Sequence, residues 1–142
     1  MRFWGLLIKN QFDMDFKIAT GNIRGMCNEI KQNEVMKFIE KEKVQVCVVI
    51  ETHLKIKSIT KVCDRVFGNS NWISNVVHSH TCCRIVVGWN NSVVNVMVVN
   101  SCSQEILCLV EIVGKRLRFY CSFIYASNSI VEKDLMEAIN DE

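Results

Sequence analysis

Three apolar segments of the chain each lead directly into a polar side chain that can contact a metal ion or a phosphate. KIAT is followed by Gly21-Asn22, VQVCVVI is followed by Glu51, and CSFIY ends in Tyr125. If these segments are neighbouring strands of one sheet, their polar residues meet at one edge, where ligands commonly bind in α/β proteins. Mg²⁺ prefers oxygen ligands and is often held by one or two carboxylates plus phosphate oxygens. We therefore predict that Glu51 and Asn22 hold Mg²⁺ or Mn²⁺, and that Tyr125 donates to a phosphate oxygen as charge develops there.

Each of these residues also has a simpler interpretation. An asparagine beside a glycine, such as Asn22, is typical of a turn. Glu51 can be a solvated acid at the end of a strand. Tyr125 can be a core aromatic whose hydroxyl meets water. The shared position after an apolar strand is what favours the functional interpretation.

The elements that position these residues can be predicted from hydrophobic periodicity and from turn residues. Ser58 is expected to cap a helix, Gly114-Lys115 to form a two-residue hairpin connection, and Ser129 with Glu132 to form a capping box. The expected strands are 15–20, 44–50, 71–77, 84–90, 92–99, 105–113 and 116–125, and the expected helices are 28–43, 58–67 and 129–139. This order predicts an α/β fold with a mixed sheet.

The composition is that of one globular domain. The chain has 142 residues, of which 49% are hydrophobic and 23% charged, which excludes a disordered segment. A net charge of +2 permits contact with nucleic acid but does not argue for it. There is no proline and no low-complexity tract to mark a linker.

The eight cysteines are interpreted as reduced core residues. They lack the paired, closely spaced arrangement of zinc ligands, and the pair Cys82-Cys83 is interpreted as loop packing. The opening MRFWGLLIKN has too short an apolar run and no cleavage site for a signal peptide, and no segment is long enough to cross a membrane. We therefore expect an intracellular protein with no membrane association.

Four motifs in a fixed order resemble the endonuclease/exonuclease/phosphatase family, which includes abasic-site endonucleases and DNase I. They are NIRG with Asn22, ETHLK with Glu51, the strand CRIVVGWN, and FIYASN with Tyr125. The chain looks most similar to the endonuclease domain of plant non-LTR (LINE-type) retrotransposons. The resemblance covers roughly residues 15–140, and its motifs are moderately specific singly and strong in this order.

The resemblance implies a DNase I-like α/β sandwich, truncated after its first half. Residues 1–14 would be an unmatched prefix, and residues 15–142 the N-terminal portion of the endonuclease domain. Most of the second sheet is expected to be missing, which would leave an apolar sheet face uncovered.

The resemblance further implies hydrolysis of a DNA phosphodiester by in-line attack of a metal-activated water. Asn22, Glu51 and Tyr125 would be the catalytic residues, with Mg²⁺ or Mn²⁺ as cofactor and DNA as partner. Phosphate or DNA contacts would come from Arg24, Lys55 and Asn128. No obligate protein partner is expected, and a functional enzyme would act in the nucleus.

Two departures from the family pattern predict little or no activity. Gly21 stands where the family has an aromatic residue, which loosens the backbone beside Asn22. No Asp-x-Asn pair and no terminal Asp-His follow the tyrosine strand. His53, His78 and His80 precede that strand and are interpreted as loop residues.

Two other functions remain open. The first is DNA binding without cleavage, through Arg24, Lys55, Lys57 and Lys61, although such charges commonly form only a solvated face. The second is the phosphatase branch of the family, acting on small phosphoesters, which would share Asn22 and Glu51. Nicking of plasmid DNA or release of phosphate from an inositol phosphate would separate a nuclease from the phosphatase branch, and a strong fall in affinity with added salt would support DNA binding.

Overall fold

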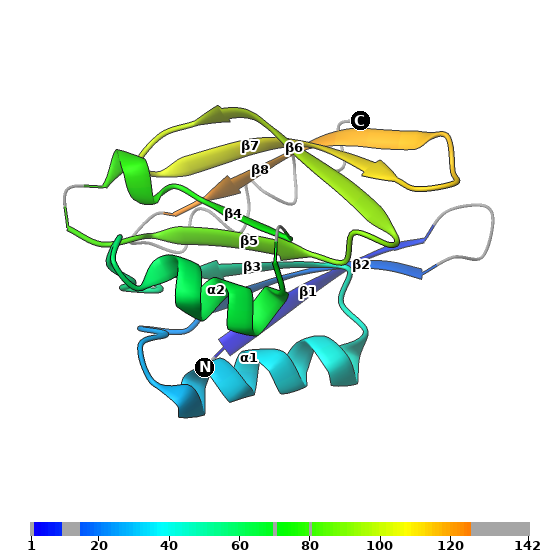
Figure 1. Ribbon diagram of the computed structural model, residues 1–142. Coiled ribbons are helices and arrows are strands. Elements are labelled where there is room, and N and C mark those ends of the chain that lie inside the picture. The colour runs from blue at the N-terminus through cyan, green and yellow to red at the C-terminus, as the bar shows by residue number, and fades with distance from the viewer. Residues whose placement is uncertain (1, 10–14, 70, 80, 126–142) are drawn as a thin grey trace.

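The computed structural model describes residues 2–9, 15–69, 71–79 and 81–125, with side chains from residue 16 onward. The predicted helix at 129–139, its capping box and Asn128 therefore lie outside the described residues. The described residues form two sheets, two α-helices and one short 3₁₀ helix (Figure 1).

The first sheet has five strands in the order β1-β2-β3-β5-β4. β2 and β3 pair in parallel across the connecting helix α1, and the other neighbouring pairs are antiparallel. The strands are β1 (Arg2–Lys9), β2 (Asp15–Asn22), β3 (Val46–Ile50), β4 (Trp72–Ser74) and β5 (Ile85–Trp89). Because β5 runs opposite to β3, its first residues lie at the same edge as the last residues of β3.

The segment before residue 15 adds an edge strand to this sheet. Arg2 to Lys9 pair with Asn22 to Asp15 along the whole of β2. The prediction that the endonuclease-like portion begins at residue 15 stays a prediction. One boundary prediction was wrong: β2 continues through Gly21 and Asn22, because the ladder with β3 extends to the pair Asn22–Ile50.

The second sheet is an antiparallel meander in the order β6-β7-β8. Its strands are β6 (Val94–Ser101), β7 (Glu105–Ile112) and β8 (Leu117–Ile124). The predicted two-residue connection between β7 and β8 was wrong, because the ladder closes at Ile112–Leu117 and leaves residues 113–116 as the turn. Gly114 takes the positive φ of +78° that this longer turn requires.

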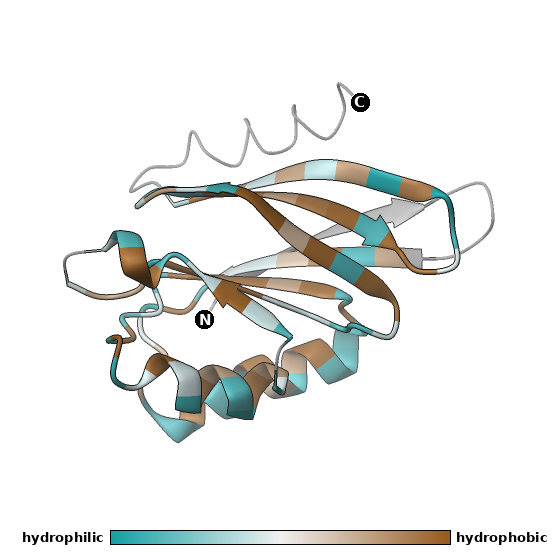
Figure 2. Cartoon of the chain, turned by 45° about the horizontal axis from the view of Figure 1, so that its top comes forward, coloured by the Kyte–Doolittle hydropathy of each residue, from teal (hydrophilic) through white to brown (hydrophobic). Residues whose placement is uncertain are grey.

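The two sheets enclose the main hydrophobic core, and the helices cover the other face of the five-stranded sheet (Figure 1). Val46 and Val48 of β3 face the second sheet, whereas Cys47 and Val49 face the helices, so β3 is buried on both sides. Figure 2 shows the hydrophobic residues (brown) that this packing needs along the strands.

The expectation that an apolar face of the first sheet would stay uncovered was wrong. Three strands suffice to bury the sheet face that carries Ile18, Val48 and Val87. Some exposed apolar residues lie on the second sheet, where Met97 is 57% and Tyr120 is 53% exposed. Others lie elsewhere, among them Ile30 on α1 and Val77 on the 3₁₀ helix Val76–His78.

Both described helices begin and end near their predicted positions. They are α1 (Glu29–Glu42) and α2 (Ile59–Phe67), with Asn28 capping α1 by accepting from the Lys31 amide at 2.9 Å. Ser58 is the N-cap of α2, but its hydroxyl donates to the Lys55 carbonyl instead of accepting from the helix. Neither helix has the length and apolar character that a membrane span needs.

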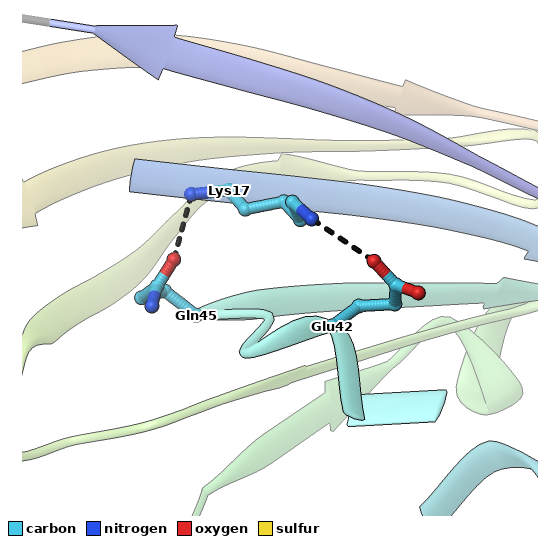
Figure 3. Close-up of polar contacts among 3 residues, drawn as sticks. All are labelled: Lys17, Glu42 and Gln45. Carbon is cyan, nitrogen blue, oxygen red and sulfur yellow. Dashed lines mark hydrogen bonds and ion pairs between the residues drawn. The ribbon is translucent and has the colours of Figure 1, made fainter. Parts of the chain in front are cut away.

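Lys17 fixes the register of the parallel pair β2–β3 (Figure 3). Its backbone amide donates to the Gln45 side chain at 2.6 Å, and the Gln45 amide donates to the Lys17 carbonyl at 3.0 Å. The Lys17 ammonium also lies 3.3 Å from Glu42 at the end of α1. That ion pair is partly exposed and contributes little. The two bonds to Gln45 set the register that places Asn22 opposite Ile50, immediately before Glu51.

We predict that Gly88→Ala destabilises the fold by about 1–3 kcal/mol through overpacking. A Cβ at Gly88 would lie 2.1–2.5 Å from ring atoms of Phe67, which packs from α2 onto β5. Denaturant unfolding measures the effect. The double variant Gly88→Ala/Phe67→Leu should lose less than the sum of the two single losses, and strict additivity would contradict the proposed clash.

Burial determines which cysteines react. Desolvation raises the pKa of Cys47 and Cys108 to about 12 and also raises the pKa of Cys63 and Cys83, whereas Cys27 and Cys102 are exposed. We predict that iodoacetamide at pH 8 labels the exposed thiols of the native protein within minutes and the five buried thiols, which include Cys121, only after unfolding. Mass spectrometry of the labelled peptides checks this.

The same shifts predict a loss of stability in alkali. A thiol with a raised pKa keeps its proton in the folded state and loses it in the unfolded state once the pH passes its ordinary pKa of 9.0. The stabilising contribution is therefore complete below pH 9 and declines as pH rises toward 12. A midpoint of urea unfolding that does not change between pH 8 and pH 10.5 would contradict this.

Candidate functional site

One edge of the five-stranded sheet gathers polar residues from four strands, and we call this edge the rim. β2, β3 and β4 all end there, and β5 starts there because it is antiparallel to β3 and β4. The rim comprises Asn22, Glu51, Asn75 and Arg84, with Tyr125 following β8 of the second sheet.

Glu51 and Tyr125 meet at the rim across 74 positions of sequence. The Tyr125 hydroxyl donates to Glu51 Oε1 at 3.3 Å, and both side chains are half-buried. Tyr125 packs beside the core between the sheets and its amide donates to the Gln104 carbonyl at 2.8 Å. The contact therefore joins one group from each sheet, at a place that solvent can reach.

Asn22 lies on the neighbouring strand, on the face that looks toward the second sheet. Strand residues alternate between faces, and Asn22 shares its face with Phe16 and Ile18 of the inter-sheet core. Its Oδ1 accepts from the Arg24 amide at 3.1 Å. Asn22 is the last residue of β2, and its side chain stabilises the turn that follows the strand. An amide oxygen has two lone pairs and the NH₂ group two donors, so capacity remains for a ligand.

Main-chain hydrogen bonds join the loops that follow β2 and β3. The Gly25 amide donates to the Glu51 carbonyl and the Met26 amide to the Thr52 carbonyl, both at 2.7 Å. Thr52 is fully buried and its hydroxyl donates to the Cys83 carbonyl at 2.9 Å. The backbone that carries Glu51 is therefore fixed on both sides.

These same loops hold strained backbone. Arg24, Glu51 and His53 have φ values of 52°, 56° and 56°, in the left-handed region that non-glycine residues rarely adopt. Each such residue costs on the order of 1 kcal/mol, and such strain concentrates at functional sites. The strain lies where a site was expected from the sequence.

Arg84 is a rim residue that the sequence reasoning missed. Its guanidinium Nη1 donates to the Tyr125 hydroxyl at 3.2 Å, and its Cζ lies 5.1 Å from the centre of the Tyr125 ring. The sequence prediction rested on polar residues that follow strands. An antiparallel strand brings its first residue to that same edge, so the arginine of CRIVVGWN was the available signal.

Asn75 was also missed, and it is the buried support of the rim. The side chain is fully buried; its Oδ1 accepts from the Arg84 and Ile85 amides at 3.3 and 2.9 Å. Its Nδ2 donates to the Cys102 and Ser103 carbonyls at 3.2 and 3.0 Å. Asn75 thereby connects the start of β5 to the β6–β7 turn of the second sheet. The sequence analysis placed Asn75 inside the expected strand 71–77. That boundary was wrong, because β4 ends at Ser74 and a 3₁₀ helix follows at Val76–His78.

The oxygen groups of the rim fit a hard divalent cation. Glu51 supplies one carboxylate and Asn22 one amide oxygen, and Mg²⁺ commonly binds to so few protein ligands when phosphate and water complete its shell. Within the described ranges no three His, Cys, Asp or Glu side chains cluster as a metal site. His53 is an exposed loop residue, as expected, whereas His78 is exposed at the end of a short 3₁₀ helix (Val76–His78). His80 lies outside the described residues.

The residues predicted to contact phosphate or DNA lie at different distances along the chain from the rim. Arg24 and Lys55 are exposed on the loops after β2 and β3, close to the rim in sequence, and Lys57 and Lys61 are exposed further along. Asn128 lies outside the described residues. The structure thus brings Glu51 and Tyr125 into contact and places Asn22 on the neighbouring strand, opposite Ile50. The basic residues are exposed on the loops that follow.

Two solved nucleases have a similar structure. The endonuclease domain of TRAS1, a telomere-specific non-LTR retrotransposon, matches with a TM-score of 0.57 and 8% identity. The AP endonuclease LMAP from Leishmania major matches with a TM-score of 0.55 and 14% identity. The chain has a DNase I-like fold. The predicted fold class is therefore confirmed.

The likeness is limited in extent and in sequence. It covers 89% and 91% of this chain but only 52% and 47% of the two nucleases, so the chain spans about half their length. At these identities the likeness concerns the fold alone. No protein-family model matches the chain, and no curated protein matches it significantly.

We predict that Asn75→Ala destabilises the DNase I-like fold by about 3–5 kcal/mol. The change removes the partners of two amides and two carbonyls in the buried rim, and each unsatisfied group costs about 1–3 kcal/mol before water compensates. Asn95→Ala, on the exposed side of β6, is the matched control and should stay within about 0.5 kcal/mol of the parent. Equal losses in the two variants would contradict the supporting role.

Proposed function

We propose that the rim is part of a metal-dependent site for DNA phosphodiester hydrolysis. The observation that supports this most strongly is the contact of the Tyr125 hydroxyl with the Glu51 carboxylate, made between two sheets of a DNase I-like fold. A buried structural tyrosine could pair with any acceptor. This one pairs with the carboxylate that the family motif ETHLK assigns to metal binding.

The residues of the rim have separate tasks in this proposal. Glu51, with the amide oxygen of Asn22, would hold a divalent cation. When bound, that ion would polarise the scissile phosphate and stabilise the leaving oxygen. Tyr125 would turn its O–H from Glu51 toward a non-bridging phosphate oxygen and stabilise the charge that develops there. The two sheets hold these groups in place before substrate arrives, so little reorganisation is needed.

The proposed substrate is DNA, as in the endonucleases of plant non-LTR retrotransposons that the motifs resemble. Arg24 and Lys55 extend the rim outward with positive charge that could follow a phosphate backbone. Among the described rim side chains there is no carboxylate or histidine placed to activate the attacking water. We therefore propose that this chain by itself cuts DNA slowly or not at all, since losing one preorganised group already costs about 10²–10³ in rate.

We predict that Mn²⁺ binds at Glu51. In NMR spectra of the 142-residue chain, paramagnetic broadening should appear first at Asn22, Glu51 and the residues beside them. Glu51→Gln should weaken Mn²⁺ binding at least about tenfold, because the only carboxylate of the described rim is lost. The matched control is Glu40→Gln, on the exposed side of α1, which should bind as the parent does. Equal broadening in the parent and in Glu51→Gln would refute a metal site at the rim.

A plasmid-nicking assay with Mg²⁺ tests the substrate. Any nicking should disappear in Glu51→Gln and in Tyr125→Phe and persist in Glu40→Gln. Release of phosphate from an inositol phosphate, without nicking, would instead favour the phosphatase branch. Nicking that survives Glu51→Gln would assign the activity to a contaminant or to another site.

A further inference from the structure

Main-chain hydrogen bonds hold Arg84 at the rim, independently of the contacts that its side chain makes. The Arg84 carbonyl accepts from the Glu51 amide at 2.8 Å, and the Arg84 amide donates to the buried Asn75 at 3.3 Å. Glu51 and Asn75 thus hold the Arg84 backbone from two sides. The origin of its side chain relative to the Glu51 carboxylate is therefore fixed by the sheet.

The guanidinium, the phenol and the carboxylate form a short chain of contacts. Arg84 Nη1 donates to the Tyr125 hydroxyl at 3.2 Å, and that hydroxyl donates to Glu51 Oε1 at 3.3 Å. A tyrosine hydroxyl has one donor and two acceptor sites, so it can make both bonds at once. It can also redirect its proton to a new acceptor while still accepting from Arg84.

The guanidinium has more capacity than these contacts use. Arginine carries five N–H donors in one rigid plane that matches the geometry of phosphate. In the described part of the chain the one ion pair is Lys17–Glu42, so Arg84 is not neutralised there by a directly paired carboxylate. Arg84 is only half-buried, so a ligand can reach it. Packing on Tyr125 alone contributes about 0.5–1 kcal/mol and would not require a position beside Glu51.

We propose that Arg84 is the phosphate-binding residue of the rim. One N–H of its guanidinium keeps the Tyr125 oxygen in place, and the remaining N–H groups donate to a non-bridging oxygen of the substrate phosphate. The choice of a phosphodiester as ligand rests on the proposed function, but the binding of a phosphate group by Arg84 requires no metal ion. Arg84 would thus both bind the anion and position Tyr125 against it.

The test is a phosphate titration of the full chain in EDTA. Inorganic phosphate and the dinucleotide TpT serve as separate probes, and the arginine side-chain N–H signals are followed by NMR. The Arg84 signal should shift in a saturable way with each probe. Arg84→Gln should weaken binding roughly ten- to a hundredfold, the loss expected for charge-assisted hydrogen bonds. Arg84→Lys should recover part of the affinity, because it restores the charge but not the planar fork.

Arg118→Gln is the matched control. Arg118 is an exposed arginine on β8, and its loss should leave both affinities unchanged. Unchanged affinity in Arg84→Gln, or an equal loss in Arg118→Gln, would overturn the proposal.

The stacking of Arg84 on the Tyr125 ring has its own NMR signature. Upfield shifts of the Arg84 side-chain protons should persist in Tyr125→Phe and vanish in Tyr125→Leu. If those shifts survive in Tyr125→Leu, the positioning contact is not made.

Glu51→Gln separates this proposal from the metal site. Without metal, removing the nearby negative charge should leave phosphate binding at Arg84 as tight as in the parent or tighter. If Glu51→Gln abolishes Mn²⁺ binding while Arg84→Gln leaves phosphate binding intact, the metal site stands and the role of Arg84 is overturned. If Arg84→Gln alone has its expected effect, the phosphate site stands and the metal site fails.

Discussion

The site depends on the fixed position of β3 between two hydrogen-bonded neighbours. β3 pairs with β2 on one side and β5 on the other, and both of its faces are buried. The position of its last residue, Ile50, along the sheet is therefore fixed by both ladders. Glu51 inherits that position and adds two main-chain bonds of its own, to Arg84 and Gly25. A slip of one residue in either ladder would turn the neighbouring side chains to the opposite face.

The second sheet adds the other half of the arrangement. Tyr125 can meet Glu51 only because the two sheets share one apolar core, and because Asn75 fixes the β6–β7 turn against the start of β5. The apolar core alone sets the distance between the two sheets, but it opposes the sliding of one sheet over the other only weakly. The directional bonds of Asn75 resist that sliding at the rim. Buried polar groups of this kind stabilise one packing over its alternatives when all their partners are satisfied.

Much of the fold could be predicted from the sequence because its signals are local. The apolar run of β3 and the spacing of Val62 and Val66 in α2 reflect burial directly. The turn at Gly114 was predicted in place but not in length, since loop length follows from the ladder and not from the glycine. The edge strand β1 was not predicted, because its pairing partner is specified only in three dimensions.

The residues of the candidate site likewise divide into those that the sequence predicted and those that it did not. Asn22, Glu51 and Tyr125 stand after apolar runs, and that pattern is visible in one dimension. Arg84 stands before a strand, and its relevance depends on β5 being antiparallel to β3, which periodicity does not reveal. The side chain of Asn75 acts through bonds to residues 8 to 28 positions away, which no local pattern in the sequence reveals.

The backbone of Glu51 shows why an acid follows this buried strand at all. At φ 56° a glycine would relieve strain on the order of 1 kcal/mol, and turns commonly use glycine for that reason. A glycine here would keep both main-chain bonds of residue 51, since neither involves the side chain. What it would lose is the carboxylate that accepts from Tyr125. The fold thus tolerates an unfavourable conformation to keep one carboxylate at the rim, which is a structural reason to look for its function there.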